Sequence, residues 1–310
     1  MTSLFDALEW KRHAIPGEAA YGQLEIGIGQ VGSGGPVALV AAGVHGDEGP
    51  WGALAIRKLL ESTSVDALQG TLRVVPCANP LAMQADARNA PLDTLDLNRS
   101  FPGNAGGSHT EVLAAVLANE AVAGCDLVID LHGGGSWCVN AFAFEMPGGE
   151  HISRAFGAPF VVKAPDRTVT LTGYARSLGA TVAAVEMGGR SVDELAWAER
   201  IADGLRRALT IAGVLRGTAT EPPIQSIPVG ETTVLRPRAG GLFVPEVKAA
   251  DVGTIVPKGT SLGRVLDSVT LAVRETLVAP FDETALLLLR PHIARLEGGA
   301  MTYVVAQPLR

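Results

Sequence analysis

Three apolar runs in the first two-thirds of the chain each end on a polar side chain, and glycine follows at the next position or the one after it. Short apolar runs bounded by glycine are typical of buried strands, and their alternation with helix-like segments indicates a mostly parallel sheet wrapped by helices. Such sheets bind ligands at the carboxyl ends of their strands. The chain is therefore expected to gather these polar side chains at one end of its sheet. They are His45, His132 and Glu186, after the apolar runs 37–44, 128–131 and 180–185.

The same alternation predicts the secondary structure of this part of the chain. Strands are expected at residues 24–28, 37–42, 71–77, 127–130, 160–162 and 181–186. Helices are expected at residues 49–61, 111–121, 174–178 and 192–212. Ser108 and Glu111 fit a capping box, in which a hydroxyl and a carboxylate satisfy the first free amides of a helix. His109 lies between them, so we interpret it as a helix-entry residue and not as a ligand.

The His-x-x-Glu pattern at His45 and Glu48 is typical of a zinc site. Zinc binds imidazole nitrogen and carboxylate oxygen in near-tetrahedral geometry, and two side chains three apart on a turn can converge on one ion. Taken alone, the pair also fits an exposed turn whose glutamate stabilises the start of a helix. His132, at the end of a second strand, adds a third ligand. Two His and one Glu leave a fourth position open to water, as catalytic zinc sites do.

Glu186 ends the third apolar run and is the candidate general base. A carboxylate near a metal-bound water can take its proton and later deliver it to a leaving amine, which suits a group partly shielded from solvent. The alternative interpretation is a surface glutamate at a strand terminus.

A loop rich in Pro and Asn supplies positive charge between these strands. It contains Arg88 and the run from Asp96 to Gly103, which includes Asn98 and Arg99. Guanidinium matches a carboxylate with a planar fork, and near zinc it can also stabilise an oxyanion. Arg99 with Asn98 suits the binding of a carboxylate, and Arg88 suits the stabilisation of an oxyanion. For either arginine considered alone, a surface salt bridge is the other interpretation.

These motifs together resemble the succinylglutamate desuccinylase/aspartoacylase family, a branch of the zinc carboxypeptidase superfamily. The similarity runs in order from about His45 to Gly189 and is specific as a set. The motifs are His45-Gly46-Asp47-Glu48, Asn79-Pro80, Arg88, the run Leu97-Asn98-Arg99-Ser100-Phe101-Pro102-Gly103, Asp130-Leu131-His132 and Glu186-Met187-Gly188-Gly189.

The resemblance implies one zinc ion per chain, held by His45, Glu48 and His132, with Glu186 as base and acid. It also implies that Arg88 polarises the scissile carbonyl and that Asn98 and Arg99 hold a substrate carboxylate. The interval between the two arginines is a little longer than in aspartoacylase itself. For the fold, the resemblance implies a mixed eight-stranded sheet, and a homo-oligomer is compatible with it because relatives often pair.

After about Gly217 helical periodicity stops, and Glu221-Pro222-Pro223 indicates a linker into a β-rich remainder. We therefore divide the chain into a zinc-dependent catalytic α/β domain at 1–220 and a C-terminal β-rich domain at 221–310. Two similar blocks beginning near residues 239 and 279 resemble the barrel-sandwich hybrid of biotinyl and lipoyl carriers. Lys248 lacks the hairpin setting of the modified lysine in those carriers. We interpret this domain as structural or as a substrate-shaping lid, since fold alone does not give function.

Composition excludes several classes of function. The net charge of −7 and the pI near 5.4 argue against a nucleic-acid surface, which needs clustered Lys and Arg. No apolar run approaches the length of a membrane span, and the first twelve residues lack the features of a signal peptide. Three cysteines make a disulfide framework improbable and buried packing a better interpretation than zinc ligation. A reducing cytoplasm is the expected location.

We therefore expect a zinc-dependent hydrolase that cleaves the amide of a small N-acylated amino acid or a related carboxylated amide. The expected partner is a small anionic substrate. A zinc carboxypeptidase or isopeptidase that acts on peptides would use the same residues, and it is distinguished by whether the C-terminal domain closes the cleft. A nonenzymatic binding protein is disfavoured because ligands and base are all present. The acyl group stays open, since Arg167 and Arg176 each fit either a second carboxylate or the surface.

Overall fold

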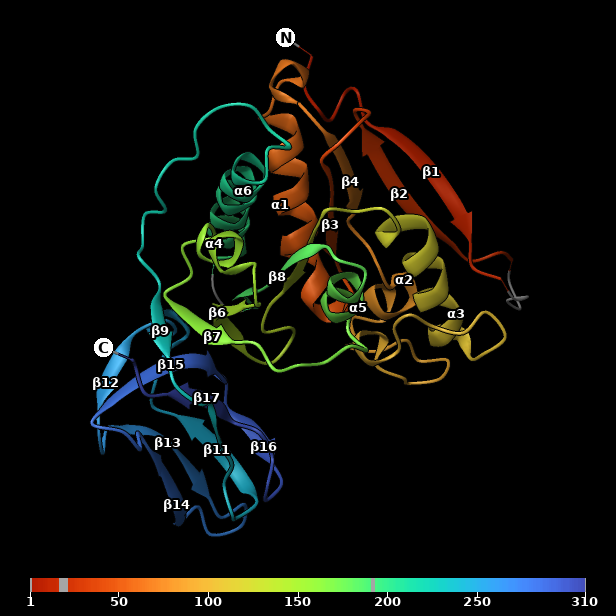
Figure 1. Cartoon of the computed structure of the whole chain (residues 1–310). Helices are drawn as coiled ribbons and strands as arrows, with labels where there is room; N and C mark the ends of the chain where they lie inside the picture. The colour runs from red at the N-terminus through yellow and green to blue at the C-terminus, as the bar shows by residue number, and fades with distance from the viewer. Residues whose placement is uncertain (1, 17–21, 191–192, 310) are drawn as a thin grey trace.

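The computed structural model describes residues 2–16, 22–190 and 193–309. Between residues 9 and 188 the described chain forms eight strands of one mixed sheet (Figure 1). The strands β4, β3, β5 and β8 are parallel, whereas β1, β2 and β6 pair antiparallel with β2, β4 and β8. This confirms the α/β fold with a mixed sheet. The strands are β1 (Glu9–Ala14), β2 (Glu25–Val31), β3 (Val37–Ala42), β4 (Thr71–Val75), β5 (Leu127–His132), β6 (Val139–Glu145), β7 (Phe160–Lys163) and β8 (Thr181–Gly188).

Six of these strands lie where the sequence predicts them, with ends that shift by a few residues. β3 has the predicted bounds, while β5 and β8 extend two residues farther, to His132 and Gly188. β1 and β6 are missing from the prediction. β1 is almost wholly exposed and has no apolar pattern. β6 is buried only because strands from distant parts of the chain flank it.

Helices cover both faces of the sheet, and the side chains of β3 show how the two faces are divided. Ala38 and Val40 belong to one apolar cluster, together with residues of α1 (Gly49–Glu61) and α6 (Glu194–Ile211). Leu39 and Ala41 belong to another, together with residues of α3 (His109–Val116) and α5 (Leu171–Ser177). Successive strand residues point to opposite faces. The central strands are therefore buried from both sides, as the uninterrupted apolar runs predict.

The helix starts follow local capping chemistry. Ser108 and Glu111 form the expected capping box, with Ser108 N donating to Glu111 Oε2 at 2.8 Å. The predicted helix 111–121 is helical over its whole length, but it begins at His109, α3 ends at Val116, and the chain continues as a π-helix (Leu117–Val122). α5 begins earlier than predicted, since the Thr170 hydroxyl accepts from Gly173 N at 3.0 Å. Among the described residues no helix has the length and apolarity to cross a membrane.

The chain after α6 is β-rich, as predicted, and forms two groups of strands. The first group joins the main sheet, because β9 pairs with β7 and β15 pairs with β6. β12 and β17 then pair with β15, and β10 pairs with β17. The second is a separate antiparallel sheet in the order β14-β13-β11-β16. The strands are β9 (Ile227–Val229), β10 (Thr233–Leu235), β11 (Gly241–Pro245), β12 (Ile255–Pro257), β13 (Ser261–Leu266), β14 (Val273–Val278), β15 (Glu283–Leu289), β16 (Ala294–Leu296) and β17 (Tyr303–Ala306).

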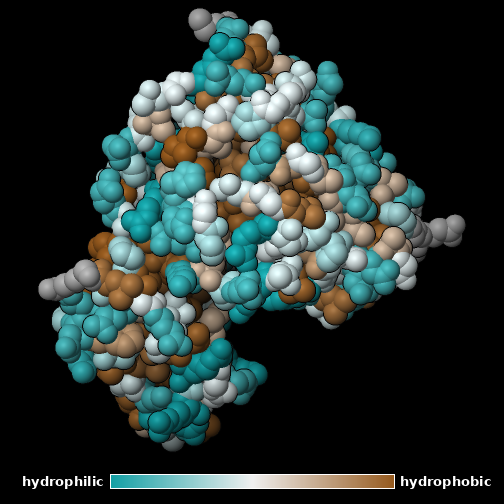
Figure 2. All heavy atoms as spheres, viewed as in Figure 1, coloured by the Kyte–Doolittle hydropathy of each residue, from teal (hydrophilic) through white to brown (hydrophobic). Residues whose placement is uncertain are grey.

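The C-terminal part stands out as a lobe below the main body, drawn in blue in Figure 1. The space-filling view shows a notch between the two, and polar and apolar residues are mixed on the surface seen there (Figure 2). Backbone pairing between β15 and β6 nevertheless makes the lobe continuous with the main sheet.

Candidate active site

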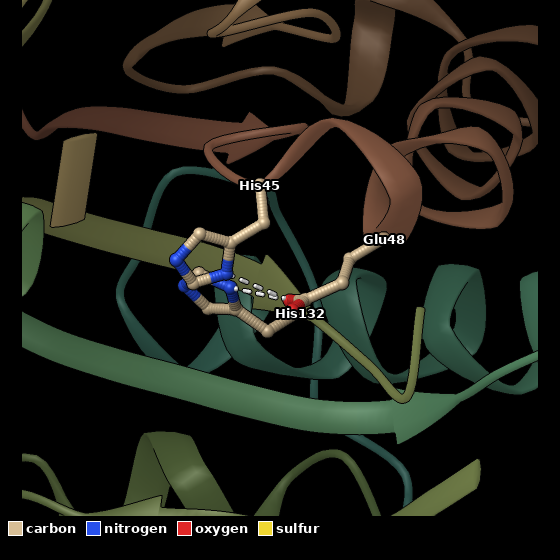
Figure 3. Close-up of side chains that lie close together, drawn as sticks. All are labelled: His45, Glu48 and His132. Atoms are coloured by element: carbon tan, nitrogen blue, oxygen red, sulfur yellow. Dashed lines mark hydrogen bonds and ion pairs between the residues drawn. The ribbon is translucent and has the colours of Figure 1, made fainter. Parts of the chain in front are cut away.

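The side chains of His45, Glu48 and His132 converge at the carboxyl ends of β3 and β5 (Figure 3). His132 is the last residue of β5, and His45 follows β3 after a short turn. The Nδ1 atoms of His45 and His132 lie 3.0 and 2.9 Å from Oε2 of Glu48. All three residues are buried. The structure therefore brings together the three residues predicted as ligands.

The turn that carries Glu48 depends on a close backbone approach. The 3-10 turn (Gly46–Glu48) lies against α2 (Pro80–Gln84), and a Cβ on Gly46 would overlap the backbone of Ala82. Asn79 caps that helix, since its Oδ1 accepts from Ala82 N at 3.3 Å. The Asn-Pro motif at Asn79 thus fixes the helix against which the turn packs.

A carboxylate lies behind each histidine. Nε2 of His132 is 2.7 Å from Oδ2 of Asp130, and Nε2 of His45 is 3.2 Å from Oδ1 of Asp96. Because a carboxylate only accepts, we assign the Nε2 proton of each ring to these bonds. Both Nδ1 atoms are then directed at Glu48. A carboxylate behind a ligating histidine fixes its orientation and raises its basicity.

The geometry and charge of this group fit a metal ion. One ligand atom from each residue lies within 4.8 Å of the others, and two imidazole nitrogens with one carboxylate oxygen suit zinc. Burial lowers the pKa of His132, but Asp130 and Glu48 outweigh it and raise that pKa well above its usual value. Burial raises the pKa of Glu48, but His45 and His132 hold it well below its usual range. The group therefore favours positive charge at the point where the three side chains meet.

Glu186 lies on β8 opposite His132 of β5. Its Oε2 accepts a hydrogen bond of 2.8 Å from Nδ2 of Asn140 on β6. Burial is the main reason that the pKa of Glu186 is raised, and the charge of Glu48 adds to it, although His132 and Asn140 act in the opposite direction. A carboxyl group with a raised pKa is suited both to remove a proton and to return it.

Arg88 reaches the group of candidate ligands from the loop after α2. Its Nη2 donates to Oδ2 of Asp96 at 2.9 Å, and its Nη1 donates to Oε1 of Glu48 at 3.2 Å. A guanidinium keeps its proton at all relevant pH values, so Arg88 adds a permanent positive charge here. Its ion pairs are with partly or fully buried carboxylates. Arg88 is thus half-exposed and forms ion pairs with two carboxylates of the candidate site.

Asn98 and Arg99 lie next to each other but face different surroundings. Asn98 is buried, its Oδ1 accepts from Leu171 N at 2.9 Å, and its Nδ2 lies 3.2 Å from Nε2 of His132. Arg99 is exposed, and its Nη1 donates to the Asn98 carbonyl at 2.6 Å. Asn98 thus ties α5 to the site, whereas the guanidinium of Arg99 is open to a ligand.

A cavity of about 410 Å³ is lined by all seven residues predicted for the site. Arg167 lines it as well, whereas Arg176 pairs with Asp166 and is not among the lining residues. Leu288 and Met301 of the C-terminal part complete the wall. The remaining apolar lining includes the aromatic side chains of Trp137, Phe142 and Phe144.

This arrangement can be compared with known proteins. Residues 34–212 match the model of the succinylglutamate desuccinylase/aspartoacylase catalytic domain. The chain belongs to this family. The resemblance found in the sequence motifs is thereby confirmed.

Relatives of known structure or activity fit the succinylglutamate desuccinylase/aspartoacylase family. An N-alpha-acetyl-L-2,4-diaminobutyric acid deacetylase from Halomonas elongata is 32% identical over 224 residues, 66% of this chain. The chain spans only 63% of that relative. Product-bound ectoine utilization protein EutE (DoeB) from Ruegeria pomeroyi is 25% identical, with a TM-score of 0.81 over 97% of this chain and 95% of that one. A succinylglutamate desuccinylase/aspartoacylase from Rhodobacter sphaeroides is also 25% identical, with a TM-score of 0.83 over 97% and 96%.

Three residues that contact the predicted site received no role from the sequence motifs of this family member. The contact of Asp130 could be predicted from the sequence, because Asp130 lies two residues before His132 on the same strand and both side chains therefore point to the same face of the sheet. Asp96 precedes Asn98 and Arg99, but only the folded loop places it on His45. The contact of Asn140 with Glu186 could not be predicted from the sequence, because the strand that carries Asn140 was not predicted.

Proposed function

We propose that this protein is a zinc-dependent hydrolase that cleaves the amide bond of a small N-acyl amino acid or a related carboxylated amide. The observation that carries the proposal is the convergence of His45, Glu48 and His132 beside Glu186 in a cavity with arginine side chains. The first three residues would hold the metal ion. Zinc, when bound, supplies a Lewis acid that lowers the pKa of water and polarises a carbonyl.

Glu186 is the group that moves protons. It takes a proton from the attacking water as the water oxygen bonds to the carbonyl carbon. It then delivers that proton to the nitrogen as the carbon–nitrogen bond breaks, and a free acid and an amine leave. Its raised pKa and its place beside His132 support both steps.

The arginines bind charge on the substrate. Arg88 donates to the oxygen of the carbonyl under attack, where negative charge develops. Arg99 anchors the substrate carboxylate with its exposed guanidinium. Asn98 assists at the same carboxylate and holds the turn from which Arg99 extends. Arg167 adds to the positive field that attracts an anionic substrate.

The substrate class follows from the cavity and from the relative that deacetylates N-alpha-acetyl-L-2,4-diaminobutyric acid. Arginines on one side favour a carboxylate, and a volume of about 410 Å³ suits a small molecule. Leu288 and Met301 narrow the cavity from the C-terminal side, which disfavours the alternative of a peptidase. As part of the same proposal, residues 1–220 form the catalytic domain and residues 221–310 form a domain that shapes the cleft.

The proposal is tested by a screen of N-acyl amino acids and dipeptides with detection of the released amine. We expect release from carboxylated N-acyl amino acids and little from dipeptides. His45→Ala and His132→Ala should lose zinc by metal analysis, because each removes one of three ligands. Absence of hydrolysis of every carboxylated amide by zinc-loaded protein would rule out the function.

A further inference from the structure

The side chain of Asn140 donates a hydrogen bond to the side chain of Glu186. Its Nδ2 donates to Oε2 at 2.8 Å, and Asn140 is only 3% exposed. A carboxylate accepts and never donates when ionised, so the amide must present its nitrogen to it. The bond therefore occupies one carboxylate oxygen, Oε2, with a neutral donor.

The sheet register explains why Asn140 reaches Glu186. On the antiparallel strands β6 and β8, Asn140 lies opposite Gly188 and Phe142 lies opposite Glu186. Residues in a diagonal relation on one face of such a pair are within reach of each other. Gly188 fixes the backbone at this point of β8, because a Cβ there would lie 2.9 Å from Nε1 of Trp51.

The other side of Asn140 is held by the C-terminal domain. Leu288 of β15 lies opposite Asn140, and Leu289 lies opposite Val139, in an antiparallel pair. The Oδ1 atom of Asn140 lies 3.8 Å from Sγ of Cys138, a weak donor that also bonds the Gly134 carbonyl. Backbone pairing on both edges of β6 thus fixes the residue that contacts the candidate base.

We propose that Asn140 is a positioning residue for the hydrolysis reaction: it holds Oε2 of Glu186 so that Oε1 is the oxygen that takes and returns the proton. This inference rests on the proposed function. Asn140 does not touch the reacting atoms, and it acts through the orientation of Glu186. β15 contributes by fixing the backbone from which Asn140 extends.

The test compares zinc-loaded wild type with Asn140→Ala, Asn140→Asp and Asn140→Gln. The alanine variant removes the donor, the aspartate variant keeps the shape but replaces the donor with a carboxyl group, and the glutamine variant keeps the amide on a longer chain. Glu145→Gln is the matched control, because it lies on the same strand and pairs with Arg154 away from the cavity. Zinc content and unfolding midpoints are measured for every variant.

We expect the kcat for an N-acyl amino acid to fall about 10- to 100-fold in the alanine and aspartate variants, with KM and zinc content unchanged. Asn140→Gln should recover part of the loss, and Glu145→Gln should match wild type. A purely structural role predicts instead that kcat, zinc content and stability decline together in all three variants. That pattern, or an unchanged kcat in Asn140→Asp, would overturn the proposal.

Crystal structures of the same proteins separate this inference from the proposed function. We expect one orientation of the Glu186 carboxylate in wild type and a displaced or divided orientation in Asn140→Ala. If wild type hydrolyses no N-acyl amino acid but Glu186 shifts in this way, the function fails and the positioning of Glu186 stands. If Glu186 keeps its place without the amide, the positioning role is wrong whatever the activity.

Discussion

The two sides of the cleft are built differently. The strand side consists of Asp130, His132, Asn140 and Glu186, all on neighbouring strands. The loop side consists of Arg88, Asp96, Asn98 and Arg99, all between α2 and α3. The side chain of Asp130 is 1% exposed, whereas those of Asp96 and Arg88 are 22% and 46% exposed. Groups on strands are held more tightly than groups on loops. The comparison suggests that the strand side fixes the reacting groups and the loop side adjusts to the substrate.

The largest effect is expected on the strand side at the base itself. Glu186→Gln keeps the shape and the contact site for Asn140 but cannot take a proton. We expect kcat to fall about 10²- to 10⁴-fold, while zinc content stays at the wild-type level. Metal analysis and steady-state kinetics check this. Full turnover by this variant would show that a group other than Glu186 transfers the proton. The strand side would then not hold the reacting base.

A direct comparison of the two sides replaces the carboxylates behind the histidines. Asp130→Asn and Asp96→Asn each weaken the orientation of one ligand, so zinc affinity should fall about 10- to 100-fold. We expect the larger loss for Asp130→Asn, because Asp130 is buried on the strand and has no solvent to replace its bond. Competition with a chelator measures both affinities. Equal losses would show that the loop holds His45 as firmly as the strand holds His132.

Arg99 tests the role of the loop side in substrate binding. Arg99→Ala removes an exposed guanidinium together with its hydrogen bond to the Asn98 carbonyl, so KM should rise about tenfold, as expected for one charge-assisted hydrogen bond. A change in KM with kcat preserved identifies binding that is equal in ground and transition states. Arg176→Ala is the control, since its ion pair with Asp166 lies outside the lining of the cavity. A fall in kcat alone would assign Arg99 to the chemical step instead.

The smallest effect is on the stability of the zinc-free protein. Burial raises the pKa of Asp96, but the hydrogen bond and charge of His45, with those of Arg88, hold it well below the usual range. Such a group stabilises the fold above the pKa of the unfolded chain, about 3.9, and loses this effect as pH falls. Asp96→Asn should therefore cost about 2 kcal/mol at neutral pH and progressively less below about pH 4.

Urea unfolding at several pH values measures this difference. Asp166→Asn serves as the control, because a surface pair of this kind usually contributes less than about 1 kcal/mol. A cost of Asp96→Asn that stays constant down to strongly acidic pH would show that the charge of Asp96 is not what stabilises the loop.

The sequence predicted the ends of β3, β5 and β8 to within two residues because their pattern is local. An apolar run that ends on His or Glu and then glycine identifies the strand and its reactive residue together, as His132 and Glu186 illustrate. Parallel neighbours then bring their carboxyl ends side by side. The prediction of the candidate metal ligands required no knowledge of distant contacts beyond this rule.

The parts that escaped prediction depend on pairings between distant segments. Asn140 lies on β6 between β8 and β15, which come from later parts of the chain, so nothing near Asn140 in the sequence indicates its partner. The contact of Asp96 with His45 likewise needs the folded loop. Leu288 and Met301 reach the cavity from a part of the chain whose strands gave only a β-rich pattern.

The pairing of β15 with β6 has a consequence for the order in which the enzyme matures. A ribosome makes the chain from its amino end, and segments fold as they emerge. All the candidate ligands and the candidate base are synthesised well before β15, so a nascent chain holds them while Val139 and Asn140 of β6 still lack their partners on β15. Contacts between such distant segments form late because loop closure costs entropy. On the proposed function, the positioning of Glu186 by Asn140 should therefore be completed only after β15 has paired, late in biogenesis.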